Sequence, residues 1–258
     1  MAFKIPPMRS RRPRRRSASQ RVLRRGSAVS RQTSLDLVFV LDTGVGMARA
    51  LHYMCGAFPE VVRELRRTKQ KPRLGLICYK DHEVEGDPVS THALSESLGT
   101  SISFLSDPEL RIGEGSTQAA GALGCALGAA RHMRWRPDAR KALVVITDRP
   151  PYGGARESRV DCPHHADYRD EVDALRRAGV ELSTISVGSV LATRRILEWM
   201  AAETRSIYLE LPEVEESADL LLGATHRLCD DLSRFRATLK EFGHLTPSRL
   251  DILHRLSA

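Results

Sequence analysis

The sequence predicts a doubly wound α/β fold, with a mostly parallel β-sheet, one antiparallel edge strand and helices on both faces. Apolar runs of strand length alternate regularly with amphipathic segments of helix length, which indicates right-handed crossovers between parallel strands. Several of these runs are apolar at nearly every position, as in strands that are buried on both faces. The 258 residues suffice for one large or two small domains.

The first half of the chain supplies three strands and two helices. Residues 35–41 (LDLVFVL) form an apolar run that predicts a buried strand. A helix is expected from Gly46 to about Arg67, because apolar residues recur on one stripe; these are Leu51, Met54, Phe58, Val61, Val62 and Leu65. Residues 72–79 predict a second strand, and residues 87–95 alternate in polarity, which predicts the antiparallel edge strand. A weak helix follows at 97–105.

The second half continues the alternation. Residues 113–133 open with a glycine loop and predict a long helix of small residues that ends near Met133 and approaches the sheet closely. An apolar strand at 141–148 ends in an acid, and a helix at 165–179 is closed by Gly179. The remaining expected elements are a strand at 180–188, a helix at 192–204, a short strand at 206–211 and a helix at 215–235.

The two ends of the chain differ from this pattern. Residues 1–34 are rich in Arg, Ser and Pro and poor in large apolar residues, so they are expected to be a disordered basic tail. Residues 35–235 would form the domain. Residues 236–258 would be a C-terminal extension with a short helix near 245–256.

The charge is concentrated in the tail. Of the 40 Lys and Arg residues, eleven precede Asp36 with no acid among them, so the rest of the chain has 29 bases against 32 acids. The net charge of +8 therefore belongs to the tail, and nucleic-acid association is expected only there. No apolar run approaches the roughly 18–20 residues of a membrane helix. The five widely spaced cysteines favour a reducing compartment and hence the cytoplasm.

Two of the expected strands end in an aspartate, Asp42 and Asp148, at the edge where ligands bind in such sheets. A third loop at this edge offers Ser116 and Thr117. Carboxylates and a hydroxyl are hard oxygen ligands that suit Mg²⁺ or Mn²⁺.

Other chemistries fit less well. Asp42-Thr43-Gly44 is the triplet of an aspartic protease, but there is no second triplet and the chain turns helical after it. A haloacid-dehalogenase-like enzyme needs a second acid where Gly44 stands. The stretch DCPHH (161–165) groups one Cys and two His, yet zinc needs four ligands and no second pair lies at a suitable spacing. Pro163 is expected to start a helix with these histidines in its first turn, and Cys162 lacks a visible helper for nucleophilic chemistry.

Four motifs in order resemble the von Willebrand factor A (vWA) family. They are the strand with Asp42 followed by Met47 and a helix, CYKDH (78–82), GEGSTQAAGAL (113–123) and VVITDRPPYGG (144–154). The intracellular branch found in bacterial proteins and beside α-kinases is the most similar. The resemblance implies a vWA or Rossmann-like fold over roughly residues 35–222.

The resemblance also implies a metal-ion-dependent adhesion site. Asp42 and Asp148 match the family's acids, and Thr117 matches its threonine with Ser116 as the alternative. The family's two serines fall on Gly44 and Gly46, so both hydroxyl ligands are lost. Two alternatives stay open: a weakened, water-rich Mg²⁺ or Mn²⁺ site, or a degenerate site kept for its fold. Without metal the two carboxylates would repel each other unless a base such as Arg149 or a water network intervenes.

The resemblance implies a non-enzymatic scaffold that binds a protein partner at the carboxyl edge of its sheet. The predicted partner-binding rim comprises Thr43, Gly44, Gly46, Arg149, Pro150, Pro151 and Tyr152. Relatives serve beside MoxR-type AAA+ ATPases or in bacterial defence and signalling clusters, and the Arg-dominated composition suggests a high-GC bacterial genome. The alternatives are a metal-dependent hydrolase that uses Asp42 and Asp148, and nucleic-acid association through the basic tail.

Overall fold

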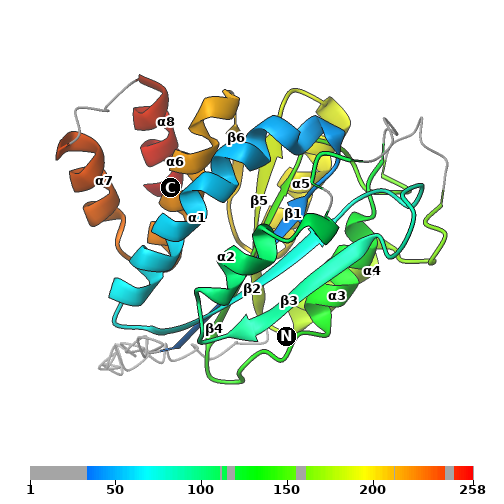
Figure 1. Ribbon diagram of the computed structural model, residues 1–258, viewed down its shortest axis with the longest axis horizontal. Coiled ribbons are helices and arrows are strands. Elements are labelled where there is room, and N and C mark those ends of the chain that lie inside the picture. The colour runs from blue at the N-terminus through cyan, green and yellow to red at the C-terminus, as the bar shows by residue number, and fades with distance from the viewer. Residues whose placement is uncertain are drawn as a thin grey trace, which may run out of the picture. The chain divides into compact units, whose positions relative to one another are not determined.

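The computed structural model describes residues 34–110, 112–114, 120–154, 161–211, 213–241 and 247–257. In this part of the chain a sheet has the strand order β3-β2-β1-β4-β5-β6 (Figure 1). β3 pairs antiparallel with β2 at one edge, and all other neighbours are parallel. The predicted sheet with its antiparallel edge strand is confirmed. Its strands are β1 (Ser34–Asp42), β2 (Lys71–Tyr79), β3 (Val89–Ser95), β4 (Arg140–Thr147), β5 (Val180–Val187) and β6 (Tyr208–Leu211).

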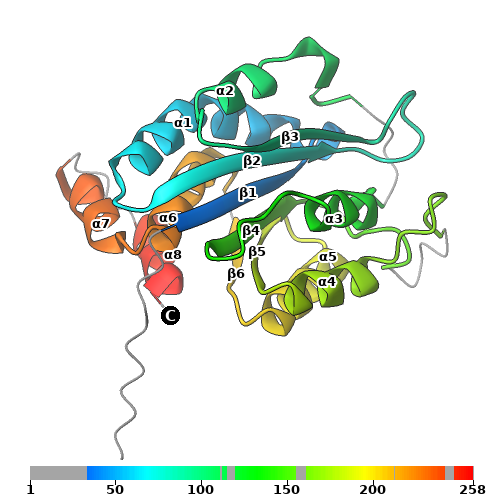
Figure 2. The same cartoon turned by 90° about the horizontal axis from the view of Figure 1, so that it is seen from below.

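Helices cover both faces of the sheet. Figure 2 shows α1 and α2 on one side of the strands and α3, α4 and α5 on the other. The long helices are α1 (Ala48–Arg67), α3 (Leu123–Arg131), α4 (Tyr168–Arg177), α5 (Leu191–Glu203), α6 (Ser217–Leu228), α7 (Leu232–Glu241) and α8 (Pro247–Ser257). The short ones are η1 (Val45–Met47), α2 (Thr100–Leu105), η2 (Pro108–Leu110) and η3 (Val214–Glu216). None of the described helices is long and apolar enough to cross a membrane.

The side chains of β1 point alternately to the two faces of the sheet, and each face has its own hydrophobic core. Leu37 and Phe39 pack on the face that α1 and α6 cover, and the rings of Phe39 and Phe58 meet edge to face at 5.6 Å. Val38 and Val40 point to the opposite face, with α3, α4 and α5. Successive side chains of a strand point to opposite faces, so the unbroken apolar run at 37–41 fits a central strand with a hydrophobic core on each side.

A buried charge pins the amino end of β1. Asp36 is fully buried, and Arg73 donates to both of its carboxylate oxygens, at 2.9 and 2.6 Å. The backbone N–H of Arg136 also donates, at 2.7 Å. Burial acts to raise the pKa of Asp36, but these hydrogen bonds and charges outweigh it and the pKa is lowered. Asp36 thus ties β1, β2 and the segment before β4 together at the end of the sheet away from Asp42.

The helix of small residues is much shorter than predicted. α3 begins at Leu123 and ends at Arg131. The two residues directly before it are held by other loops, because Gly121 N–H donates to Pro150 O and Ala122 N–H donates to Lys80 O. Long-range backbone hydrogen bonds have here overridden the helical propensity of the Ala-rich sequence.

The prediction for DCPHH was also wrong. α4 begins at Tyr168, and Asp167 caps it by accepting the backbone N–H of Arg169 at 2.8 Å. Pro163 and the two histidines lie before the helix, and His165 has a φ of 57°. This left-handed conformation breaks any helix that Pro163 could start. Gly179, with a φ of 73°, closes α4 as expected.

One predicted helix at the C-terminal side is two. The chain leaves α6 at Cys229 and Asp230, where Asp230 has a φ of 56°, and α7 then begins at Leu232. α8 packs against α6: a β-carbon at Gly223 would lie 2.6 Å from Leu256 Cδ1, and Leu256 is fully buried. The C-terminal helix therefore contributes to the core over α1 and α6.

Candidate functional site

The two aspartates that end β1 and follow β4 lie at the same edge of the sheet. Leu41 is in register with Ile146, so Asp42 and Asp148 leave neighbouring strands side by side. Arg149 links them, with its Nε 3.0 Å from Asp42 Oδ2 and 4.0 Å from Asp148 Oδ1. Both acids were predicted from the sequence to lie at this edge, and Arg149 was predicted as a base that could lie between them.

Asp42 is fully buried and surrounded by donors. Its Oδ1 accepts from the backbone N–H of Gly44 at 2.9 Å and from Arg149 Nη2 at 3.0 Å. Its Oδ2 accepts from the Thr147 hydroxyl at 2.9 Å and from Arg149 Nε at 3.0 Å. A carboxylate has about four lone-pair positions, so these four hydrogen bonds use its whole accepting capacity.

Gly44 makes room for the guanidinium. A β-carbon at residue 44 would lie 1.4 Å from Arg149 Nη2, so any side chain there would exclude the arginine. The backbone of Gly44 is extended, with φ −70° and ψ 174°, which any residue can adopt. A side chain at position 44 would therefore displace the guanidinium from its place beside Asp42. A β-carbon at Gly46 would lie 1.9 Å from Asp148 Oδ2, so a side chain there would move this carboxylate.

Asp148 is less well satisfied than Asp42. Its side chain is 25% exposed, and its Oδ1 is buried without a hydrogen-bond partner among the described residues. Burial raises the pKa of Asp148, and the negative charge of Asp42 raises it further. Asp148 is therefore the acid of the pair with remaining capacity to accept a hydrogen bond.

A third acid completes the surroundings of Arg149. Asp81 follows β2 and is fully buried; its Oδ2 lies 3.4 Å from Arg149 Nη1. Its Oδ1 accepts the backbone N–H of Glu83 at 2.9 Å, so it also organises the turn after β2. Burial acts to lower the pKa of Arg149, but the hydrogen bond and charge of Asp42 outweigh it and the pKa is raised.

The described residues do not fit a divalent cation at Asp42. Its acceptor positions are filled, a guanidinium lies where the side chain of residue 44 would be, and neither Gly44 nor Gly46 offers a hydroxyl. Thr43 does not replace them, because its hydroxyl donates to Tyr79 O at 3.0 Å. Ser116 and Thr117, the remaining metal-ligand candidates, lie outside the described residues.

Most of the predicted partner-binding rim is buried. Thr43, Gly44, Arg149, Pro150, Pro151 and Tyr152 are buried, and Gly46 is exposed. The Pro150–Tyr152 loop pairs with Gly121 through backbone hydrogen bonds on both sides. Among the described residues, the large apolar side chains that reach solvent at this edge are Val45, Val190 and Leu191, with exposed fractions of 43%, 49% and 57%.

A group of cysteine and histidine side chains lies at the same edge, and the sequence did not reveal it. His82 Nε2 is 3.2 Å from Cys162 Sγ, and Cys125 Sγ is 3.5 Å from Cys162 Sγ. His164 Nδ1 is 3.7 Å from Cys125 Sγ. His82 and Cys125 are 43 residues apart and Cys125 and Cys162 are 37, so no local spacing marks them. The signal that could have found them is that His82 and Cys162 follow β2 and β4 at this edge, and that Cys125 lies in the first turn of the helix that follows Gly121, which pairs with the loop after β4.

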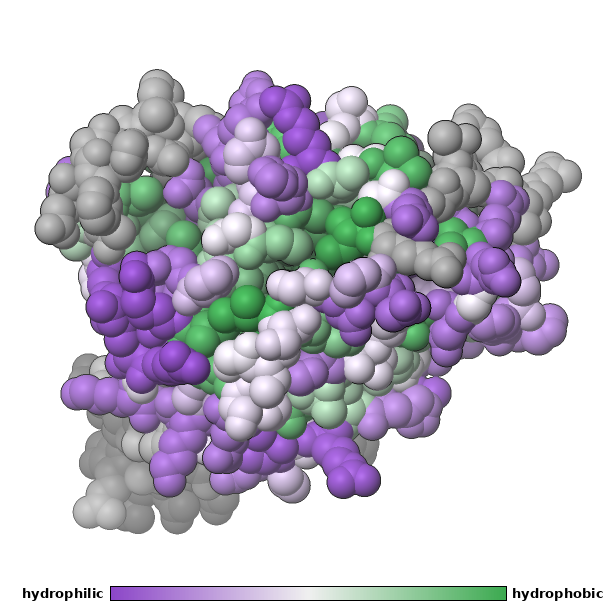
Figure 3. All heavy atoms as spheres, viewed as in Figure 1, coloured by the Kyte–Doolittle hydropathy of each residue, from purple (hydrophilic) through white to green (hydrophobic). Residues whose placement is uncertain are grey.

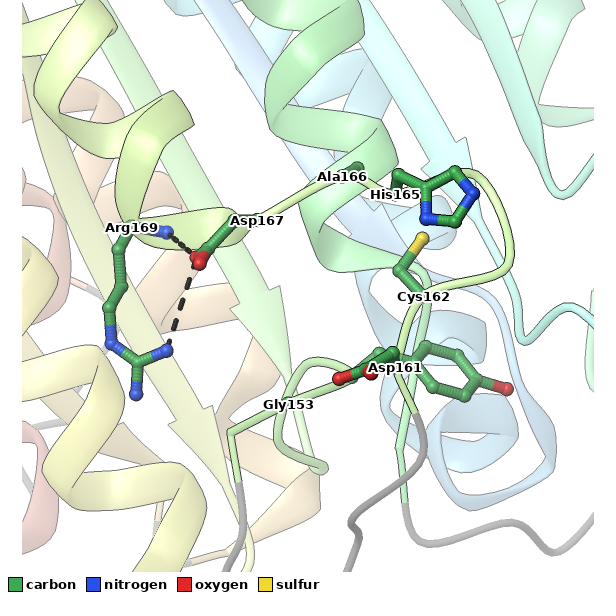
Figure 4. Close-up of a pocket in the computed structure, with 8 residues that line it drawn as sticks. Gly153, Asp161, Cys162, His165, Ala166, Asp167 and Arg169 are labelled. Atoms are coloured by element: carbon green, nitrogen blue, oxygen red, sulfur yellow. Dashed lines mark hydrogen bonds and ion pairs between the residues drawn. The ribbon is translucent and has the colours of Figure 1, made fainter.

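Two hollows open near this edge. One of about 240 Å³ has Cys162 and His165 on one side and Asp167 with Arg169 on the other (Figure 4). The other, of about 400 Å³, is lined by Thr43, Lys80 and residues of the β2–β3 loop and η2. Neither is lined by Asp42 or Asp148, so neither presents these acids to a small molecule.

Comparisons with known proteins agree with this architecture. Residues 36–221 match the von Willebrand factor type A domain family. None of the curated proteins matches the chain. Solved structures with a similar fold include the pilus adhesin SpaC from Lactobacillus rhamnosus GG, with a TM-score of 0.59 and 13% identity over 77% of this chain. A von Willebrand factor type A structure from Catenulispora acidiphila has a TM-score of 0.53 and 13% identity over 76% of this chain.

The matched region covers only 31% of the SpaC chain and 43% of the Catenulispora chain, so the likeness concerns the fold of one domain. The family match, in contrast, extends from β1 to α6 and includes both site aspartates. The chain belongs to the von Willebrand factor type A domain family.

Proposed function

We propose that this chain is a protein-binding module that docks its partner at the carboxyl edge of the sheet without a divalent cation. The family is one of interaction and adhesion modules. The observation that carries the metal-free part is the bidentate contact of Arg149 with Asp42, which places a fixed positive charge on the family's first metal ligand. A guanidinium matches a carboxylate in a planar, two-pronged geometry and stays charged at every physiological pH.

The surface that meets the partner is centred on Asp148. Val45 follows β1 and Val190 with Leu191 follows β5, the strands on either side of β4, so exposed apolar side chains flank the partly exposed acid. In Figure 3 hydrophobic residues reach the surface in the upper right, near where α1 begins in Figure 1. A partner that supplies apolar side chains and one Lys or Arg for Asp148 would suit this surface.

The partner group expected here has the opposite charge to the group that a metal-dependent site binds. A bound cation attracts a carboxylate from its partner, whereas Asp148 attracts a donor. Its pKa is raised by burial and by Asp42, so pairing with a cationic group would relieve an unfavourable charge.

The hydrolase alternative has less support. A general base or metal ligand needs a free lone pair near the substrate, and the four acceptor positions of Asp42 are all used inside the fold. Nucleic-acid association rests on the tail, which lies outside the described residues. Removal of residues 1–34 tests it, because electrostatic binding of this kind should be lost with the tail and should weaken steeply with salt.

We further propose a bacterial cytoplasmic setting, with a partner such as a MoxR-type AAA+ ATPase or a component of a defence or signalling cluster. The five cysteines are free in the structure, which supports a reducing compartment. The composition and the resemblance to the intracellular branch support the rest.

The metal-free mechanism is tested by calorimetry with Mg²⁺ and Mn²⁺. The wild type should give no binding heat. The triple variant Gly44→Ser, Gly46→Ser, Arg149→Ala, which restores both hydroxyls and removes the internal cation, should gain binding. Heat in the wild type that disappears in Asp42→Ala would sink the proposal.

The docking surface is tested with a photo-crosslinking residue at Val190 in lysate of the native host. Crosslinked partners should be the same with and without EDTA, and Leu191→Asp and Asp148→Asn should reduce them. Leu250→Asp is the matched control, because Leu250 is also an exposed leucine, at 48%, but lies on α8. Equal loss in Leu250→Asp and Leu191→Asp would place the contact elsewhere.

A further inference from the structure

The Cys and His side chains at the carboxyl edge come from three separate segments. His82 lies just after β2, and Cys125 lies in the first turn of α3. Cys162 and His164 lie in the segment between β4 and α4. Two thiols and two imidazoles from different loops therefore meet at one place, although they are scattered over 83 positions of the sequence.

The distances between the ligand atoms have the size of the edges of a zinc tetrahedron. With Zn–S near 2.3 Å and Zn–N near 2.0–2.1 Å, ideal angles give about 3.8 Å for S···S, about 3.6 Å for S···N and about 3.3 Å for N···N. The two sulfurs, of Cys125 and Cys162, are 3.5 Å apart. The sulfur–nitrogen distances are 3.2 Å from Cys162 to His82, and 3.7 Å from Cys125 to both His82 and His164.

The ring nitrogens of His82 and His164 also lie near each other. The ligand atoms of His82, Cys125 and His164 all lie within 4.8 Å of one another, and the two imidazole rings are 4.6 Å apart between centroids. His164 is exposed, so its ring can turn toward Cys162, which is two residues away in the same loop. The three ligand atoms within this distance do not include that of Cys162, so a four-ligand site requires His164 to rotate in this way.

The environment selects the metal. Thiolates and imidazoles favour Zn²⁺ over Mg²⁺ and Ca²⁺, which prefer oxygen. Cys162 is only 6% exposed, and the ring of Tyr152 packs 5.0 Å from that of His82, so the inner side of the group is shielded from water. The exposed His164 leaves an entry path from solvent.

A disulfide accounts for less of the arrangement. Its sulfurs must come to about 2.05 Å, whereas those of Cys125 and Cys162 are 3.5 Å apart. It would also leave unexplained why two imidazole nitrogens face the same pair of sulfurs.

We propose that His82, Cys125, Cys162 and His164 hold one Zn²⁺ as a structural site, separate from the degenerate site at Asp42. The ion would cross-link the loop after β2, the start of α3 and the loop before α4. His82 is the neighbour of Asp81, which contacts Arg149, so the ion would also hold the loop that braces the internal cation. This inference does not depend on where a protein partner docks.

The test measures zinc in the full-length chain. Protein expressed with added zinc, desalted and analysed by elemental mass spectrometry should contain one zinc per chain. Metal-free protein refilled with Co²⁺ should develop the visible absorption of a tetrahedral thiolate complex. Two fewer thiols should react with a thiol reagent in the zinc-loaded protein than in the metal-free protein.

Variants assign the ligands. Cys125→Ser, Cys162→Ser and His82→Asn should each bind zinc at least ~10-fold more weakly, the size of effect that loss of an outer-shell partner alone can produce. Cys229→Ser is the control, because Cys229 is also half-buried but lies after α6. The wild-type cobalt spectrum and thiol protection decide the question if the variants fail to fold.

Three results would overturn the proposal. One is a wild type that takes up no zinc or cobalt under these conditions. Another is a Cys125–Cys162 disulfide found by peptide mass spectrometry without reduction. The third is an equal loss of zinc in Cys229→Ser and Cys125→Ser.

Discussion

Replacing Arg149 with methionine removes the guanidinium and keeps an unbranched side chain of similar length. Asp42, which is fully buried, then loses two of its four donors and its only contacting positive charge among the described residues. Water cannot take over this role without opening the site. Removing one partner of a buried ion pair typically costs about 3–5 kcal/mol, because the remaining charge is left in a medium that solvates it poorly.

The magnitude is large enough for an equilibrium measurement. Domains are stable by about 5–15 kcal/mol, so Arg149→Met should remove about a fifth or more of the stability. With a urea dependence near 3 kcal/mol/M, the unfolding midpoint should fall by about 1 to 2 M. Chemical denaturation followed by circular dichroism gives this shift directly.

A double-mutant cycle separates the pair from the packing of the arginine stem. Asp42→Asn removes the buried charge, and its amide oxygen can still accept a hydrogen bond from the Thr147 hydroxyl. The combination Asp42→Asn with Arg149→Met should be less destabilised than the sum of the single changes by about 2 kcal/mol or more. Arg177→Met is the control: this side chain is 67% exposed and pairs with Asp173 at the surface, so its loss should cost less than about 1 kcal/mol. Additive single effects, or a cost below about 1 kcal/mol for Arg149→Met, would refute the argument.

Three further substitutions test other features. The pKa of Asp148 is raised above the ordinary 3.8 by burial and by the neighbouring acid, so this carboxyl stabilises the fold below pH 3.8 and loses that contribution as pH rises through its folded pKa. Asp148→Asn should therefore raise the melting temperature at neutral pH. An unchanged dependence of the melting temperature on pH would contradict this. The pKa of Asp36 is lowered from 3.8 because its two arginine partners outweigh the effect of burial. This carboxylate therefore stabilises the fold above pH 3.8 and loses that contribution as pH falls. Asp36→Asn should lower the free energy of unfolding in urea by about 3–5 kcal/mol at neutral pH and by less in acid. Gly223→Leu would collide with Leu256 and should speed hydrogen exchange in α8 by at least ~10-fold while β1 amides stay protected; equal exchange in both would show that α8 is not docked through this glycine.

The strands were predictable because their signal is local. Residues 37–41 are apolar at every position in the sequence, and the structure buries them between two cores. The extent of α3 was not predictable, because the residues that stop it before Leu123 are bound by Pro150 and Lys80, which are close only after the sheet has formed. The break after α6 depends on Asp230 in a left-handed conformation. An aspartate in the sequence predicts such a conformation less strongly than a glycine does.

The site shows the same division. Strand ends placed Asp42 and Asp148 at one edge, and the sequence showed that glycines stand where the family has serines. Their reason is spatial: the arginine that occupies the vacated volume over Gly44 contacts Asp42 across 107 positions of the chain. The same limitation hid the Cys and His group, since DCPHH was compared with local zinc spacings and its companions lie on other loops.

Arg149 is joined to the chain by peptide bonds, and this changes how the positive charge beside Asp42 is acquired. A diffusible ion saturates its site according to its concentration and stabilises only the fraction of molecules that it occupies. The guanidinium has no dissociation equilibrium of that kind; it is present once per molecule and arrives when β1 and β4 pair. The charge of Asp42 is therefore balanced during folding, and this balance does not depend on the concentration of a divalent cation.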